Sequence, residues 1–170
     1  MTGWQNALGS NDLVVAFESS PYSDAALDFA VELAEQSGAT LHIVHVQSLA
    51  DYPIDPDIAG SEAEAETIRS SLAHVRAEVE RALGSFSGKW TYSNEKGNIV
   101  DRVNEIADRY NALAIIIGSS TSGIGGVFHR ALKGSVLKYM TKGSGRVVMV
   151  VPKHPPAGDE RTATGPEVPD

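Results

Sequence analysis

The chain has 170 residues, of which 42% are hydrophobic and 21% charged, and this size and composition are typical of one globular domain. It contains no cysteine, which excludes disulfides, thiolate zinc sites and cysteine nucleophiles. The net charge of −8 argues against binding to nucleic acid or to an anionic membrane, because both are polyanions. No apolar run approaches the roughly 20 residues that span a bilayer, and residues 1–12 lack the basic and apolar regions of a secretory signal, so we expect a cytoplasmic location.

The first predicted elements are a strand and a helix. Residues 13–17, Leu-Val-Val-Ala-Phe, form a short apolar run of the kind found in strands buried on both faces. A serine-rich turn follows, in which Ser23 is the predicted N-cap of a helix over residues 24–37. Gly38 stands where a glycine commonly ends such a helix. Residues 1–11, which precede this unit, are predicted to be flexible.

A second strand, a loop, an amphipathic helix and a third strand are predicted next, and another helix follows them. The strand covers residues 40–46, and a proline-containing loop covers residues 47–60. Apolar residues then recur at spacings of three and four on one face of an amphipathic helix, namely Ile68, Leu72, Val75, Val79 and Leu83. Residues 90–93 form a weak third strand, and Asn98 is the predicted N-cap of the following helix.

The last part of the domain combines two strands with a glycine-rich loop. Residues 113–117 and 146–151, which are apolar apart from Arg146, predict the fourth and fifth strands. Between them lie the glycine-rich loop 118–126 and a helix over residues 135–142. Residues 153–170 are rich in proline, glycine, threonine and acids, and they are predicted to form a disordered tail.

Strands alternating with helices over residues 12–152 indicate a single α/β domain with a doubly wound, five-stranded parallel sheet flanked by helices. In such a sheet a ligand binds outside the carboxyl ends of the strands, where the strand order reverses. The turns after the first, second and fourth strands are therefore the candidate site. The strand over residues 146–151 is expected at an edge, and because it carries no charge after Arg146 we expect it to pair with a second copy in a homodimer.

The loop after the fourth strand contains the glycines that best fit a ligand site. Gly118, Gly123 and Gly134 would let backbone N–H groups approach a phosphate, and Ser135 opens the predicted helix behind them. A phosphate cradle and a plain flexible connection fit this composition equally well. The Walker A loop, the dinucleotide fingerprint and the nucleophile elbow are all absent. Glu18, after the first strand, is either an acceptor for a ribose or adenine group or an exposed turn carboxylate.

The remaining polar residues suggest no catalytic or metal centre. His42 and His45 lie three apart on a predicted strand and so point to opposite faces, and a structural role is the expected one for them. No general base, metal cluster or catalytic lysine is identified. We therefore expect a binding protein. Slow ATP hydrolysis is the upper limit of the catalysis that we expect from these residues.

Several segments, in this order and spacing, resemble the universal stress protein family over residues 12–152. They are Leu13-Val-Val-Ala-Phe-Glu-Ser-Ser-Pro-Tyr-Ser-Asp-Ala-Ala-Leu27, His45-Val46, Gly97-Asn98, Ile-Ile-Ile-Gly118, Gly134-Ser135-Val136 and Val147-Val-Met-Val-Val-Pro152. The resemblance implies a Rossmann-like fold of the adenine nucleotide alpha hydrolase kind, often assembled as homodimers, with ATP and magnesium bound by some members. It also implies a role in the stress response.

By this resemblance, two groups of residues would hold the nucleotide. Ala16, Glu18 and Val46 would lie near the base, and the phosphates and ribose would be approached by Gly118, Gly123, Gly134, Ser135 and Val136. The family's ATP binders show Gly-x2-Gly-x9-Gly-Ser/Thr, whereas this chain has Gly-x4-Gly-x10-Gly-Ser, which is three residues longer. It also has Glu18 and Ser19 where the family usually has aspartate and glycine. Two functions therefore stay open: an ATP-responsive stress protein, and a dimeric scaffold or regulator whose remodelled pocket binds no nucleotide.

Overall fold

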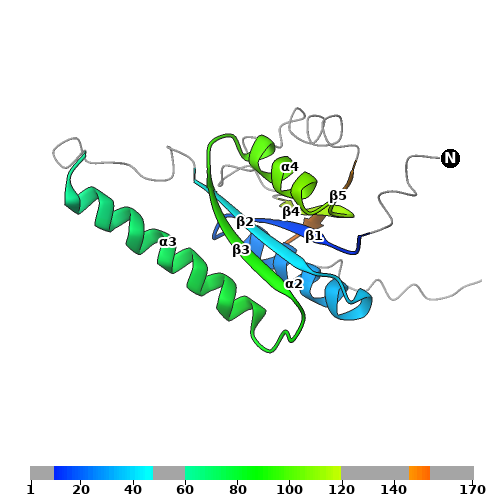
Figure 1. Ribbon diagram of the computed structural model, residues 1–170. Helices are drawn as coiled ribbons and strands as arrows, with labels where there is room; N and C mark the ends of the chain where they lie inside the picture. Colours follow the sequence, from blue (N-terminus) through cyan, green and yellow to red (C-terminus); the bar gives the residue numbers. More distant parts are fainter. Residues whose placement is uncertain (1–9, 48–59, 120–145, 154–170) are drawn as a thin grey trace, which may run out of the picture.

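A computed structural model describes residues 10–47, 60–119 and 146–153, and within them five parallel strands form one sheet (Figure 1). The strands are β1 (Leu13–Phe17), β2 (Leu41–Gln47), β3 (Trp90–Lys96), β4 (Ala114–Ser119) and β5 (Val147–Pro152). Their order across the sheet is β3-β2-β1-β4-β5. The predicted doubly wound α/β fold with a five-stranded parallel sheet is confirmed.

Helices cover both faces of this sheet. Helices α2 (Pro21–Ser37) and α3 (Glu62–Leu83) lie on one face, and α4 (Ile99–Arg109) lies on the other (Figure 1). Alternate side chains of β1 point to opposite faces of the sheet. Leu13, Val15 and Phe17 pack with α2 and α3, whereas Val14 and Ala16 pack with α4. All five residues of β1 are buried, as expected for a strand covered on both sides.

The start of α2 differs from the prediction. Ser20, not Ser23, is the N-cap, and Ser23 completes a capping box in which each side chain bonds the other residue's backbone N–H. Pro21 explains the earlier start, because proline at the first helical position has the required φ and gives up only an N–H that the helix does not use. The predicted end is confirmed, since Gly38 caps the helix with a φ of 68°.

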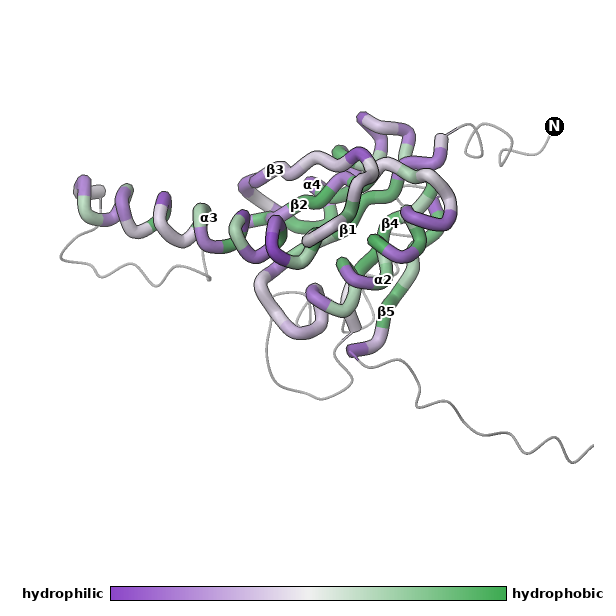
Figure 2. The backbone as a smooth tube through the Cα atoms, turned by 90° about the horizontal axis from the view of Figure 1, so that it is seen from below, coloured by the Kyte–Doolittle hydropathy of each residue, from purple (hydrophilic) through white to green (hydrophobic). Residues whose placement is uncertain are grey.

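Helix α3 extends beyond the sheet at its N-terminal half (Figure 1; Figure 2). Of the predicted apolar face, Val75, Val79 and Leu83 are buried, whereas Ile68 and Leu72 are only half-buried. Periodicity predicted the correct face of the helix. It could not show that only the second half of that face meets α2 and the sheet.

The other boundaries lie close to the predicted ones. Strand β3 extends to Lys96, β2 includes Gln47, and β4 continues through Gly118 and Ser119 into the predicted glycine loop. Asn98 is the N-cap of α4, as predicted, and accepts from two backbone N–H groups. The following predictions lie wholly or mostly outside the described residues: the N-terminal segment 1–11, the loop 47–60, the rest of the loop 118–126, the helix 135–142 and the tail 153–170.

The two histidines of β2 are both buried, and they face opposite sides of the sheet as predicted. The imidazole of His42 lies on the α4 side, where Nε2 is 3.2 Å from Asp12 Oδ2 and Nδ1 is 2.8 Å from Thr91 Oγ1. Its ring stacks on Tyr110 at 3.6 Å between centroids. On the other side, His45 Nδ1 donates to the backbone oxygen of Phe17 at 3.0 Å. The contacts of His42 join β2 to β3, to the segment before β1 and to the end of α4, so the role of His42 is structural.

Candidate functional site

The order of the strands places a reversal point between β1 and β4. From β1 the chain passes through α2 to β2 and then β3 on one side, and α4 brings it back to β4 on the other side. Helices α2 and α4 consequently lie on opposite faces of the sheet. This is the position at which parallel α/β sheets bind their ligands.

Three of the predicted site residues share one face at this edge. Ala16 and Val46 belong to the core cluster on the α4 side, and Glu18 follows β1 at a position of the same parity. The register pairs Phe17 with His45, so Glu18 is level with Val46, one position further along. Ala16 and Val46 are buried, and Glu18 is half-buried.

The turn between β1 and α2 fixes the direction of Glu18. Ser20 Oγ donates to Glu18 Oε1 at 3.1 Å, so the helix cap also holds the carboxylate. Between them Ser19 adopts a φ of 52°, a left-handed conformation that glycine adopts without strain. The Ser19 hydroxyl donates to Glu78 of α3, which ties the strained turn to that helix. The glycine that the family usually has here thus corresponds to a real conformational requirement.

Gly118 marks a close approach between the end of β4 and the start of α2. A Cβ atom at this position would lie 2.2 Å from the backbone oxygen of Tyr22 and 2.9 Å from the nitrogen of Ser23. The glycine therefore lets the first turn of α2 pack directly on the strand end. The positive end of the α2 dipole lies at this same edge, where it favours an anion.

The predicted site is thus described only in part. The structure brings Ala16, Glu18, Val46 and Gly118 to one edge of the sheet, with the missing Cβ of Gly118 directed to the α2 side. The other predicted phosphate-binding residues, Gly123, Gly134, Ser135 and Val136, lie outside the described residues.

Sequence reasoning missed the acidic contacts between α2 and α3. Glu78 accepts a hydrogen bond from the Ser19 hydroxyl, and its Oε1 lies 3.2 Å from Nε2 of His74. Partial burial raises the pKa of Asp24, and the nearby carboxylates of Glu78 and Asp28 raise it further. The Ser-Pro-x-Ser pattern could have revealed the cap at Ser20. Nothing in the sequence signals the contact of Ser19 with Glu78, because 59 residues separate the two.

Among the residues that the structure describes, no helix combines the length and the hydropathy of a membrane span. No group of three or more histidine, cysteine, aspartate and glutamate side chains in residues 10–47, 60–119 and 146–153 is arranged to hold a metal ion.

Comparison with solved structures finds the same fold in known proteins. The universal stress protein UspA from Lactobacillus plantarum is 18% identical with a TM-score of 0.62, and the match covers 83% of this chain and 97% of that one. A family protein from Arabidopsis thaliana, solved with AMP bound, is 15% identical with a TM-score of 0.56, covering 91% and 97%. A universal stress protein in complex with cAMP is 21% identical with a TM-score of 0.55, covering 85% and 98%.

At these identities the structural likeness shows the fold alone, and no curated protein sequence matches the chain. The sequence pattern of the universal stress protein family, however, matches residues 10–152, which is most of the chain and includes all five strands. The reversal point, the capped turn after β1 and the close approach at Gly118 all lie within this match. The chain belongs to the universal stress protein family.

Proposed function

We propose that this protein is a nucleotide-responsive stress protein that binds ATP, with magnesium, at the carboxyl edge of β1 and β4. The observation that carries the proposal is the grouping of Ala16, Glu18 and Val46 on one face at the reversal point of the sheet. Relatives of the same fold in complex with cAMP and AMP support an adenine nucleotide as the ligand class. A cytoplasmic location accords with this proposal, because ATP is abundant there.

Each residue group has a definite part in this proposal. Ala16 and Val46 provide a flat apolar surface for the adenine, and the Glu18 carboxylate accepts hydrogen bonds from the ribose hydroxyls or the adenine amino group. The N-terminus of α2 contributes a favourable dipole toward the phosphates. Gly118, Gly123, Gly134, Ser135 and Val136 complete the phosphate and ribose contacts.

Changing Glu18 to glutamine is expected to weaken ATP binding by about tenfold, because the hydrogen bonds lose a charged acceptor. Glutamine keeps the oxygen that accepts from Ser20, so the helix cap stays intact. Isothermal titration with ATP and magnesium measures the change, and Gly134→Ala and Ser135→Ala should abolish binding in the same assay. The matched control is Glu80→Gln, an exposed acid of α3 that pairs with Arg76.

The same preparation provides an independent test. Freshly purified protein is denatured, and the released small molecules are separated by nucleotide chromatography. Co-purified adenine nucleotide supports the proposal. An empty protein that gives no heat with ATP would show that the lengthened glycine loop has lost its phosphate contacts, and the scaffold function would replace the nucleotide one.

We further propose that the protein is a homodimer that pairs through β5. This strand lies at the edge of the described sheet, and its residues Val147 and Val150 are 38% and 40% exposed. An apolar edge of this kind is normally paired or covered. We expect Val150→Lys to convert the dimer to a monomer in sedimentation velocity at tens of micromolar, whereas Asn94→Lys on the opposite edge strand should leave it dimeric. A wild-type monomer at this concentration would contradict the proposal.

A further inference from the structure

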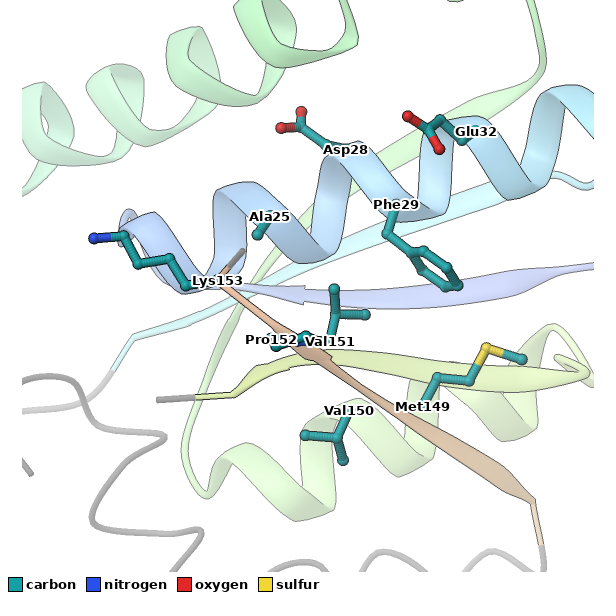
Figure 3. A pocket seen from close by; sticks show the side chains of 9 residues that line it. All are labelled: Ala25, Asp28, Phe29, Glu32, Met149, Val150, Val151, Pro152 and Lys153. Atoms are coloured by element: carbon teal, nitrogen blue, oxygen red, sulfur yellow. The ribbon is translucent and has the colours of Figure 1, made fainter. Parts of the chain in front are cut away.

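A groove separates α2 from the edge strand β5 on the α2 side of the sheet (Figure 3). Its volume is about 610 Å³. The lining comes from α2 and from the end of β5 and the residue after it: Ala25, Asp28, Phe29, Glu32, Met149, Val150, Val151, Pro152 and Lys153. None of these residues belongs to the candidate nucleotide site.

The floor of the groove is apolar and incompletely covered. Phe29 reaches from α2 toward the strands and is 40% exposed, an unusual exposure for phenylalanine (Figure 3). Met149 and Val151 face the same side and are half-buried. The sheet face over β1 and β4 is covered by α2, which also contacts β5 but leaves the side chains on this face of β5 incompletely covered. An apolar surface of this kind has the properties of a docking site.

The helical rim of the groove is acidic, and the basic residue of the lining, Lys153, lies over the Tyr22 ring at 6.0 Å from its centroid. Asp28 and Glu32 lie one turn apart on α2, a helix with four acidic residues and no basic one. Among the described residues neither carboxylate has an ion-pair partner. On α3, by contrast, Arg69 and Arg76 neutralise neighbouring glutamates. The pKa of Asp24 is raised chiefly by burial and in part by Glu78 and Asp28, which agrees with an excess of negative charge along this helix.

We propose that this groove docks a basic amphipathic helix of a partner protein. The apolar side of such a helix would cover Phe29, Met149 and Val151, as a helix covers the rest of this sheet face. Four residues of α-helix span about 6 Å, so lysines or arginines at positions i and i+4 of the partner match the spacing of Asp28 and Glu32. The net charge of −8 would attract the same partner over a longer range.

The acidic residues of the groove also disfavour three other occupants, namely a second copy of the chain, an anionic membrane and nucleic acid. A second copy of the chain whose α2 lay in this groove would bring acidic residues against acidic residues, which disfavours the contact. An anionic membrane or nucleic acid would meet the same repulsion. The proposed dimer uses the backbone edge of β5, whereas the groove is formed by side chains beside that edge, and Val150 is the residue that takes part in both.

The probe is a synthetic 18-residue peptide helix with leucines along one side and lysines flanking them. Fluorescence anisotropy measures its binding to the full chain, and circular dichroism measures its helix content. We expect Phe29→Ser to weaken binding more than tenfold and Asp28→Asn or Glu32→Gln to weaken it about two- to fivefold each. Asp101→Asn removes an exposed charge on α4, on the opposite face, and should change nothing.

Three outcomes would overturn the proposal. One is equal binding of a peptide in which glutamate replaces every lysine. Another is equal binding of a scrambled peptide of the same composition, which would show unspecific contact with leucine. The third is a change of the sedimentation coefficient, rather than of peptide binding, in Phe29→Ser, which would assign the groove to self-association. ATP titration of the same variants should be normal, so failure here is distinct from failure at the nucleotide site.

Discussion

Replacing Gly118 with alanine is expected to lower the free energy of unfolding by about 3 kcal/mol, the upper range for forcing an extra carbon into a packed site. The new Cβ would lie 2.2 Å from the Tyr22 oxygen and 2.4 Å from its carbonyl carbon. Both are backbone atoms, so no side-chain rotation relieves the clash, and the first turn of α2 must move away from β4. Urea denaturation followed by far-ultraviolet circular dichroism measures the loss.

The control for Gly118→Ala is Gly38→Ala. Gly38 has a left-handed φ of 68° but no atom within 4 Å of the added Cβ. Its replacement should cost only the conformational penalty, about 1 kcal/mol. If the two substitutions cost the same, Gly118 would be required by its own conformation or by the loop that follows, and the proposed close packing of α2 on β4 would be wrong.

Replacing His42 with alanine should be about as damaging, with an expected loss of about 3 kcal/mol. The His42 side chain is 4% exposed, and its removal leaves a cavity between β2 and α4. It also leaves Asp12 and Thr91 without their hydrogen-bond partner and removes the ring that stacks on Tyr110. Chemical denaturation at neutral pH is the measurement.

The exposed histidine of α3 provides the matched comparison for His42. The side chain of His74 is 70% exposed and pairs with Glu78 at the surface. His74→Ala should change the free energy of unfolding by less than about 0.5 kcal/mol. A His42→Ala protein as stable as His74→Ala would show that the contacts of the buried imidazole contribute nothing net to stability.

Most of the fold could be predicted because its signals are local. The apolar runs at residues 13–17 and 113–117, the periodic face of α3 and the glycine at the end of α2 are each visible within a short stretch of sequence. The alternation of strands with helices then indicates a parallel sheet. The N-cap of α2 was placed at Ser23 because both serines are good caps, and only the fixed φ of Pro21 distinguishes them. The edge position of β5 followed from its place in the strand order.

The candidate site was harder to predict because its contacts join distant segments. Glu18 was found because it follows β1, but its hydrogen bond from the cap of α2 depends on how the turn folds. The packing of Tyr22 on Gly118 and the bond from Ser19 to Glu78 join residues far apart in the chain. The groove between α2 and β5 likewise depends on which strand pairs with β4, which periodicity does not encode.

The projection of α3 beyond the sheet divides the helix into two units of different local stability. No residue before Val75 in this helix is buried, whereas Val75, Val79 and Leu83 belong to the core. Amide protons in the first three turns should therefore exchange through fraying of the helix end, and those around Val79 only through global unfolding. Among the described elements, a protease should accordingly cut the projecting turns while the sheet remains intact.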